Sequence, residues 1–301
     1  MSEIKIINRK TIKRKWWASC FAFVIAGASS TLSYAQAELV DAIVDGGNNF
    51  PWDKVELPGT VCSDGSQYKF FVHDSPSSNN LIILLEGGGA CWDYESCSGA
   101  LGKLGAVNPN GIPDDYMTQT TPKYVSPIVN GADPGLPGRG KMSIVTDGWD
   151  VVYMPYCTGD VHVGNNVAVY NDPAGANPPL TFHHNGFNNT VAATNYLAQR
   201  FGAINKLLVT GYSAGGVASL AGYHQIRSTL TAAQGYMLND SGPLFPAPNA
   251  SFNSRLLHEK ITTAWNLGPV LNTLPGSFDL NDYGSMTAML AAQYPNDQLA
   301  Y

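Results

Sequence analysis

The sequence predicts an α/β fold in which a mainly parallel sheet is flanked by helices. Short apolar runs suited to strands alternate along the chain with segments of helical periodicity, and this alternation is typical of parallel sheets. The run Leu81–Leu85 is apolar without a break, as expected of a strand buried on both faces. The chain has 301 residues, 44% of them hydrophobic, which is ample for one core. We therefore expect a single domain over residues 36–301.

Residues 1–35 are expected to be a secretory signal peptide. Residues 1–15 carry six Lys and Arg, residues 16–33 are apolar or small, and Ser33-Tyr-Ala35 offers small residues for cleavage. A membrane anchor is the alternative, but the apolar run is short and broken by Ser and Thr. A lipoprotein is disfavoured because Cys20 lies at the start of that run. We expect a secreted protein, periplasmic or extracellular, that has no membrane contact after cleavage.

The charge of the mature chain excludes some classes of partner. Removing residues 1–35 takes six basic residues and one acidic residue, which leaves 11 Lys and Arg against 22 Asp and Glu. Such an acidic surface argues against nucleic acid and anionic membranes as partners. It says little about a neutral or esterified substrate.

The cysteines predict two disulfides. Four remain after cleavage, an even count in an exported chain: Cys62, Cys91, Cys97 and Cys157. Three connectivities are open. We favour Cys91–Cys97 with Cys62–Cys157 because Cys91 and Cys97 bracket a short loop. Zinc is the rival, but the spacings match no standard ligand pattern, so no metal is expected.

The first half of the domain contains three expected strands. The first is 68–72, the second is 81–85, and the third is 150–156. Between the last two, residues 92–141 are rich in Pro and Gly, and we expect an insertion there over one side of the site.

The second half contains the expected helices. We expect residues 165–182 to be irregular and 187–201 to be an amphipathic helix capped by Asn188 or Asn189. Further along, the expected strands are 207–210 and 235–240, with a helix from 216 to 230 between them. Residues 243–285 read as a second insertion with a helical piece at 256–264, followed by a helix at 285–293 and the start of a strand at 299–301.

The segment Gly211-Tyr-Ser-Ala-Gly215 follows an apolar strand and precedes a helix of small residues. This is the G-x-S-x-G pattern in the strand–turn–helix context that a nucleophilic serine requires. Glycines flank the serine because strand and helix must approach closely there. We expect Ser213 to be a nucleophile and the amide of Ala214 to help stabilise an oxyanion.

A glycine triplet, Gly87-Gly-Gly89, follows the central strand at Glu86. A glycine-rich loop after an early strand supplies the second half of the oxyanion hole in folds with such a serine. We therefore expect Gly88 and Gly89 to present backbone amides to the substrate carbonyl oxygen.

Other polar residues are weaker candidates. Asp160 and His162 lie in a loop after the third strand, where an aspartate is more often a turn former. His183 and His184 are expected to be polar loop residues near a helix start. Asp240 should lie level with Ser213. The aromatic residues Trp92, Tyr94 and Tyr156 suit sugar stacking and packing equally well.

Four segments together resemble the pectin acetylesterase family, which also includes the Wnt deacylase Notum. They are Leu85-Glu-Gly-Gly-Gly-Ala-Cys91, Met154-Pro-Tyr-Cys-Thr-Gly-Asp160, Val209-Thr-Gly-Tyr-Ser-Ala-Gly-Gly216 and Asn239-Asp-Ser-Gly242. The resemblance runs from about Cys62 to the end of the chain. One departure is that family members often have Trp where this chain has Gly89-Ala90.

The resemblance implies an α/β-hydrolase-like fold, no cofactor, and carboxylic-ester hydrolysis by a Ser-His-Asp triad. On that basis Ser213 matches the nucleophile, and Gly88, Gly89 and Ala214 match the oxyanion donors. The Cys91–Cys97 pair also resembles a family disulfide.

The acid and base of the triad have no strong candidate in this sequence. In α/β-hydrolases the acid and then the histidine follow the serine, and after Ser213 the only histidines are His224 and His258. Neither follows a predicted strand. We expect a C-terminally truncated member whose acid and base lie beyond Tyr301, with Asp240 and His258 as weak candidates within the chain.

The sequence thus predicts a secreted serine esterase that removes acyl groups, and we expect the group to be acetyl on a polysaccharide such as pectin. The alternative is a non-catalytic module that binds glycans or esters in the same cleft. The sequence does not determine the oligomeric state.

Overall fold

A computed structural model describes most of the chain after residue 51. The chain divides into two units, residues 1–38 and 39–301, and the first, with the expected signal peptide, lies outside the described residues. Part of the first expected insertion also lies outside them, because residues 119–147 are not described. The described residues are 43–45, 52–75, 78–99, 105–118, 148–247, 253–276, 278–279 and 281–301.

In the described part of the chain, an eight-stranded sheet has the order β1-β2-β3-β5-β4-β8-β9-β10. The strands from β5 to β10 in this order run parallel, whereas β1, β2 and β3 form an antiparallel edge. The fold is therefore α/β, as predicted. The bounds are β1 (Ile43–Asp45), β2 (Asp53–Val61), β3 (Gln67–His73), β4 (Asn80–Leu85), β5 (Asp150–Met154), β8 (Ile204–Tyr212), β9 (Ala232–Asp240) and β10 (Gln298–Ala300).

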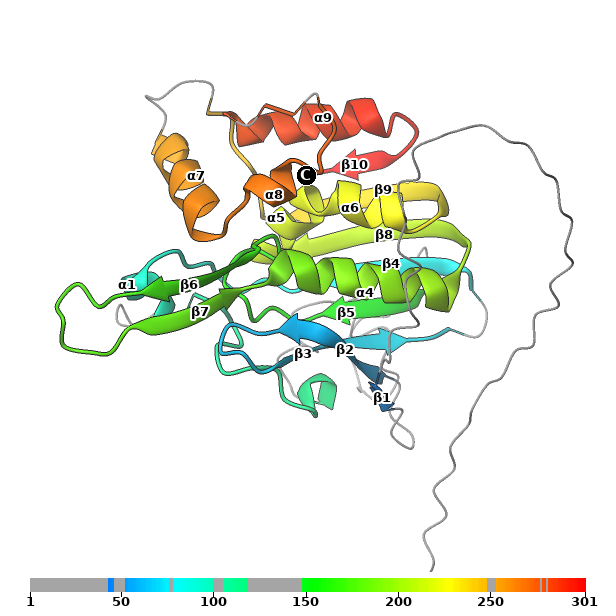
Figure 1. Ribbon diagram of the computed structural model, residues 1–301. Coiled ribbons are helices and arrows are strands. Elements are labelled where there is room, and N and C mark those ends of the chain that lie inside the picture. Colours follow the sequence, from blue (N-terminus) through cyan, green and yellow to red (C-terminus); the bar gives the residue numbers. More distant parts are fainter. Residues whose placement is uncertain are drawn as a thin grey trace, which may run out of the picture. The chain divides into compact units, whose positions relative to one another are not determined.

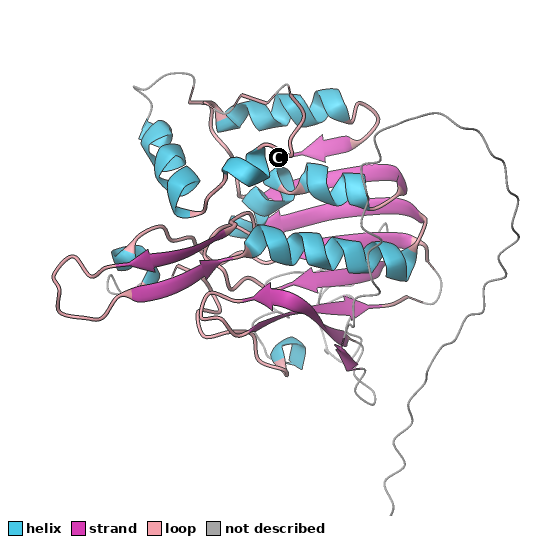
Figure 2. Ribbon diagram, viewed as in Figure 1, coloured by secondary structure: helices cyan, strands magenta, loops and turns pink. Residues whose placement is uncertain are grey.

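Helices α4, α5 and α6 lie along one face of this sheet (Figures 1 and 2). Helix α4 (Gly186–Phe201) leads into β8, and α5 (Ala214–Ala221) and α6 (Tyr223–Thr229) lead from β8 to β9. The single helix expected over 216–230 is thus two helices, which meet at Gly222. All five residues of β5 are buried, as are five of the six in β4, so the parallel centre of the sheet forms the core.

The remaining helices of the described residues lie in connections between strands. They are α1 (Tyr94–Cys97), η1 (Tyr116–Thr118), α7 (Asn253–Ala264), α8 (Gly268–Leu271), η2 (Tyr283–Ser285) and α9 (Met286–Gln293). Helix α7 begins three residues earlier than expected, and α9 begins one residue later than expected and ends where expected. No described helix has the length and apolar character needed to cross a membrane.

Residues 165–182 are not irregular, contrary to our expectation. Strands β6 (Asn166–Tyr170) and β7 (Leu180–His184) form an antiparallel hairpin on the side where the parallel strands end (Figure 1). Val167 and Val169 alternate with less exposed residues and are 59% and 61% exposed. Few large apolar residues point inward, so the strand pattern was weak in the sequence.

The expected cap of α4 is also wrong. The residue that caps α4 is Asn185, and its side chain makes no capping hydrogen bond. Asn189 instead pairs with the backbone of Val61: its Oδ1 accepts from the Val61 amide at 3.1 Å and its Nδ2 donates to the Val61 carbonyl at 2.8 Å. The asparagine therefore joins the helix to β2.

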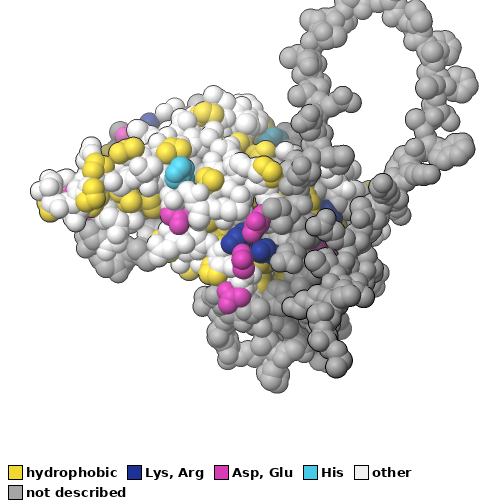
Figure 3. Space-filling view, turned by 60° about the horizontal axis from the view of Figure 1, so that its bottom comes forward, with side chains coloured by type: hydrophobic (Ala, Val, Ile, Leu, Met, Phe, Trp, Pro, Cys, Tyr) yellow, Lys and Arg dark blue, Asp and Glu magenta, His cyan; other side chains and the backbone are white. Residues whose placement is uncertain are grey.

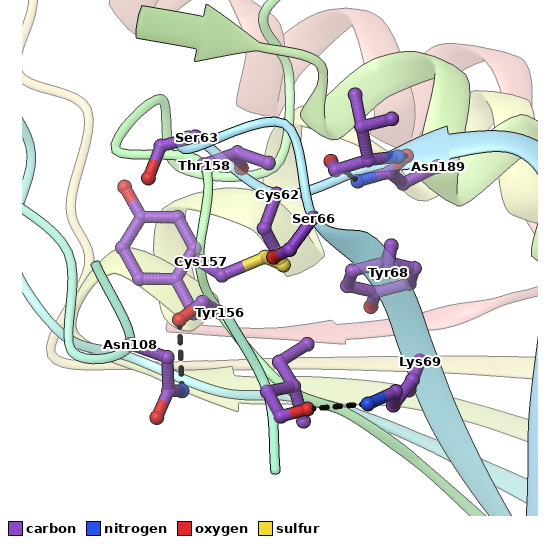
Figure 4. The surroundings of a disulfide bond; sticks show 12 residues. Cys62, Ser63, Ser66, Tyr68, Lys69, Asn108, Tyr156, Cys157, Thr158 and Asn189 are labelled. Carbon is purple, nitrogen blue, oxygen red and sulfur yellow. Dashed lines mark hydrogen bonds between the residues drawn. A yellow bond between two sulfur atoms is a disulfide. The ribbon is translucent and has the colours of Figure 1, made fainter. Parts of the chain in front are cut away.

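Both expected disulfides are present. Cys62 is bonded to Cys157 and Cys91 to Cys97. Figure 4 shows the first of these bonds between the end of β2 and the loop after β5, with Tyr68 and Tyr156 around it. It joins positions 95 residues apart in the sequence.

Charges of both signs mix on the surface. Figure 3 shows Lys and Arg side chains beside Asp and Glu side chains on one face of the molecule. Among the ion pairs, Asp114 lies 3.1 Å from Lys54 Nζ and 2.7 Å from Lys69 Nζ. Such exposed pairs contribute little to stability.

Candidate active site

Ser213 occupies a strained turn between β8 and α5. Its φ of 54° and ψ of −119° lie in a region that residues other than glycine seldom adopt. The Ser213 amide donates to the Asp240 carbonyl at 2.9 Å, and the Ser213 carbonyl accepts from the Val217 amide at 3.0 Å. The side chain is exposed. The strand–turn–helix context predicted from the sequence is therefore present.

Glycines let the surrounding backbone approach this turn. A Cβ on Gly215 would overlap the Leu85 carbonyl oxygen, and one on Gly211 would overlap the Gly215 carbonyl. A Cβ on Gly216 would lie 2.6 Å from the Asp240 carbonyl oxygen. The start of α5 is thus packed directly on the ends of β4 and β9.

The glycine loop lies beside the serine turn. In the register of β4 with β8, Leu85 is opposite Gly211, so both loops leave the sheet at the same point. Gly88 and Gly89 have φ values of 151° and 89°, which favour glycine. Among the described residues, neither amide donates a hydrogen bond to the protein. Ala214 is the first residue of α5, where an amide lacks an intrahelical acceptor.

Asp240 lies level with Ser213, as expected. It is opposite Tyr212 in the register of β8 with β9. Its exposed carboxylate accepts a hydrogen bond from the Ser241 hydroxyl at 2.8 Å. Asn239 closes the following turn, because its side chain exchanges two hydrogen bonds with the backbone of Gly242.

Each of the two histidines that follow Ser213 in the sequence packs against a tyrosine. The His258 ring, on α7, stacks on Tyr283 with centroids 4.6 Å apart, and its buried Nδ1 has no hydrogen-bond partner among the described residues. His224 Nδ1, on α6, lies 2.8 Å from the Tyr294 hydroxyl. In the part of the chain that the structure describes, no histidine hydrogen-bonds to Ser213.

Asp160 is a fully buried carboxylate that organises the loop after β5. It accepts hydrogen bonds from the Thr158 hydroxyl and from the amides of His162, Gly164 and Gly186, at 2.5 to 3.1 Å. Burial raises the pKa of Asp160 to about 7, although these hydrogen bonds lower it in part. The carboxylate therefore acts as a turn former, and it joins this loop to the start of α4.

His183 and His184 are not loop residues, contrary to our expectation, because both belong to β7. His184 is buried, with Nδ1 3.0 Å from the Thr158 carbonyl and Nε2 2.8 Å from the Tyr170 hydroxyl. Burial lowers the pKa of His184 to about 4, so the neutral ring donates through Nδ1 and accepts at Nε2. The sulfurs of Cys91 and Cys97 lie within 4.8 Å of this ring, but they are bonded to each other.

Glu86 is a buried polar residue that the sequence analysis did not single out as functional. It lies between β4 and the glycine loop and is 1% exposed. Burial raises the pKa of its carboxyl, and hydrogen bonds from Tyr116, Tyr153, Tyr156 and Asn108 partly offset that effect. An acidic residue at the end of an entirely apolar run was the available signal, since a buried charge requires partners.

Comparison with known proteins finds similarity to pectin acetylesterases. The family model described as pectinacetylesterase matches residues 146–278. Pectin acetylesterase 4 of Arabidopsis thaliana is 26% identical over 172 residues, which cover 56% of this chain and 36% of that protein. Pectin acetylesterase 11 of the same plant is 28% identical over 178 residues, covering 57% and 39%. The chain spans less than half the length of these relatives.

Two further similarities involve Notum. The palmitoleoyl-protein carboxylesterase NOTUM of Drosophila melanogaster is 49% identical over 37 residues, 12% of this chain and 6% of that protein. A solved structure of the Wnt deacylase Notum from Drosophila superposes with a TM-score of 0.49 and 18% identity, covering 84% of each chain. The family-model match and the two plant relatives therefore show that this chain is similar to the pectin acetylesterases.

Proposed function

We propose that this protein is a secreted serine carboxylic-ester hydrolase that removes acetyl groups from a polysaccharide such as pectin. The observation that carries the proposal is the strained Ser213 backbone, with φ of 54° at a strand-to-helix turn. Strain of this kind costs on the order of 1–3 kcal/mol and occurs mainly at functional sites. The names of the plant relatives supply the substrate class, and the two disulfides suit an exported protein.

In the proposed reaction the Ser213 hydroxyl attacks the acetyl carbonyl carbon. The amides of Gly88, Gly89 and Ala214 stabilise the negative oxygen that forms. The bond between the carbonyl carbon and the sugar oxygen then breaks, and the proton released by the serine hydroxyl passes to that oxygen, so the sugar leaves as an alcohol. Water next attacks the acetyl-serine ester, releasing acetate and returning a proton to the Ser213 oxygen. No metal or cofactor is needed for these steps.

An apolar cavity beside the serine turn supports a short acyl group. Its lining includes Val217, which lies one helical turn after Ser213, and its volume is about 50 Å³. Six of its lining residues are Val161, Val163, Val217, Ala221, Leu244 and Trp265. A cavity of this size suits the two carbons of acetyl better than a long lipid chain.

One observation favours a second candidate, a non-catalytic module that binds glycans or esters. None of the described histidines hydrogen-bonds to Ser213, and a serine hydroxyl without a base is a weak nucleophile.

Hydrolysis separates the two candidates. We would compare p-nitrophenyl acetate turnover and acetate release from acetylated pectin for the wild-type protein, Ser213→Ala and Ser228→Ala. Ser228 is an exposed serine on α6 and serves as the matched control. The hydrolase proposal expects activity that Ser213→Ala abolishes and Ser228→Ala retains. A folded wild-type protein that binds acetylated pectin without releasing acetate would instead support the binding module.

A further inference from the structure

We propose that Glu86 is a positioning residue that holds the glycine loop in the shape that presents the Gly88 and Gly89 amides to a substrate carbonyl oxygen. This inference rests on the proposed hydrolase function. Glu86 is the last residue before the three glycines, and its side chain points into the protein, where it is 1% exposed.

The Glu86 carboxylate has four donors. Oε1 accepts from the hydroxyls of Tyr116 and Tyr153, both at 2.6 Å. Oε2 accepts from the Tyr156 amide at 2.8 Å and from Asn108 Nδ2 at 3.2 Å. An ionised carboxylate can accept about four hydrogen bonds, so this set suits the charged form.

These donors come from separate parts of the chain. Tyr153 lies on β5 and Tyr156 in the loop after it, while Asn108 and Tyr116 lie in the segment 105–118. Asn108 Nδ2 also donates to the Tyr156 carbonyl at 3.0 Å (Figure 4). Glu86 thus joins the start of the glycine loop to two neighbouring segments at a single buried point.

The backbone of Glu86 is held as well. Its amide donates to the Met154 carbonyl at 3.0 Å, and its carbonyl lies 2.9 Å from His162 Nε2. Burial lowers the pKa of His162 to about 4, so the neutral ring must carry its proton on Nε2 to donate here. At the other end of the loop, the Cys91 amide donates to the Gly159 carbonyl at 2.8 Å.

The glycines between these two ends need such anchors. Glycine loses more conformational freedom on ordering than any other residue, and the Gly88 and Gly89 amides make no hydrogen bond to the described protein. Catalysis requires those amides to be already in place when the oxyanion forms. The loop therefore depends on its ends, and Glu86 is the more extensively bonded end.

Glu86→Gln tests this role in turnover. The glutamine amide group would replace one acceptor oxygen with a donor and would face groups that are themselves donors. We expect kcat for p-nitrophenyl acetate to fall about 100-fold, as for a small misplacement of catalytic groups, with KM changed less than about twofold. Asp150→Asn is the matched control, because Asp150 is another buried carboxyl, 5% exposed, at the opposite end of the parallel strands. It should retain the wild-type kcat.

A second measurement does not depend on turnover. We expect the ¹⁵N order parameters of the Gly88 and Gly89 amides to be near 0.85 in the wild type and in Asp150→Asn, and to fall below about 0.6 in Glu86→Gln. If Glu86→Gln does not fold, Tyr116→Phe removes one of the four hydrogen bonds and should give smaller changes in the same direction.

The outcomes distinguish this inference from the proposed function. The order parameters could fall in Glu86→Gln as expected while the wild-type protein shows no Ser213-dependent turnover. That result would support the role of Glu86 in holding the loop and reject the hydrolase function. Rigid Gly88 and Gly89 amides in folded Glu86→Gln would overturn the inference, as would mobile amides in the wild type. An unchanged kcat in an active Glu86→Gln protein would also overturn it.

Discussion

Ser213 shows how a single residue can hold backbone strain at a strand-to-helix turn. Its positive φ directs the backbone from β8 into α5, and the side chain remains exposed at the end of the sheet. The strain is maintained by the packing of Gly211 and Gly215 against neighbouring carbonyl groups. The local pattern of glycines around a serine was sufficient to predict this arrangement from the sequence.

Replacing Ser213 with glycine should stabilise the protein. Glycine adopts a φ of 54° without a steric penalty, and after its greater unfolded-state entropy is subtracted we expect a net gain of about 1 kcal/mol. Chemical denaturation of Ser213→Gly and Ser213→Ala measures this gain. Alanine removes the same hydroxyl but keeps the strain, so an equal gain in both variants would contradict the prediction.

Asp160 should make stability depend on pH. Its pKa rises from 3.8 to about 7 on folding because the carboxyl is buried. The folded state therefore binds the proton more tightly than the unfolded state does. This contribution is fully present below about pH 4 and is lost as the pH rises through about 7.

The comparison of Tm between pH 4 and pH 8 for the wild type and Asp160→Asn isolates this effect. Between pH 4 and pH 8 the Tm of Asp160→Asn should fall less than the Tm of the wild type, because the variant lacks the part of the fall that Asp160 causes. If Tm falls equally with pH in the two proteins, a group other than Asp160 causes the pH dependence of stability.

At the scale of elements, the turn before β10 is attached to α6 and β9 by one carboxylate. Asp297 accepts from Tyr223 at 2.9 Å, from Arg227 Nε at 2.8 Å and from the Gly235 amide at 3.0 Å. Burial would raise the pKa of Asp297, but the hydrogen bonds from Arg227 and Tyr223 outweigh burial and lower it. Its contribution to stability is thus present above the unfolded-state pKa and is lost as the pH falls through the folded-state pKa.

Asp297→Ala should destabilise the protein by about 3 kcal/mol at neutral pH, because Arg227 would be left without its buried partner. Urea denaturation measures the change. Asp114→Ala is the matched control, since Asp114 is paired with two lysines at the surface, and its removal should cost less than about 1 kcal/mol. Equal losses in the two variants would count against a special role for Asp297.

At the scale of the whole molecule, the two disulfides constrain the chain very differently. Cys62–Cys157 closes a separation of 95 residues, and Cys91–Cys97 closes one of 6. The longer bond joins the antiparallel edge of the sheet to the loop that also carries Asp160. In the chain-entropy description, the longer closure removes more freedom from the unfolded state.

Replacing Cys62 and Cys157 with alanine should cost about 4–5 kcal/mol, against about 2 kcal/mol for Cys91 and Cys97. Thermal and urea denaturation of the two double variants give the comparison. The prediction is wrong if loss of the shorter bond is the more damaging of the two.

Local patterns in the sequence determined the parallel centre of the sheet, the turn at Ser213 and the glycine loop. Each of these depends on residues within about ten positions, where periodicity and steric rules apply directly. The preference for two disulfides and their pairing also came from the sequence, through one short loop and an even count. The catalytic roles of Ser213, Gly88, Gly89 and Ala214 remain predictions.

Only the tertiary structure decided which polar residues are buried and what they bind. Glu86 receives its four donors from positions 22 to 70 residues away, and His184 binds a carbonyl 26 residues away. No local pattern records such partners, because a buried charge or imidazole is satisfied by whichever donors and acceptors the folded chain brings to it. The sequence could therefore locate the serine and its glycines, whereas the network that holds them was visible only in the folded molecule.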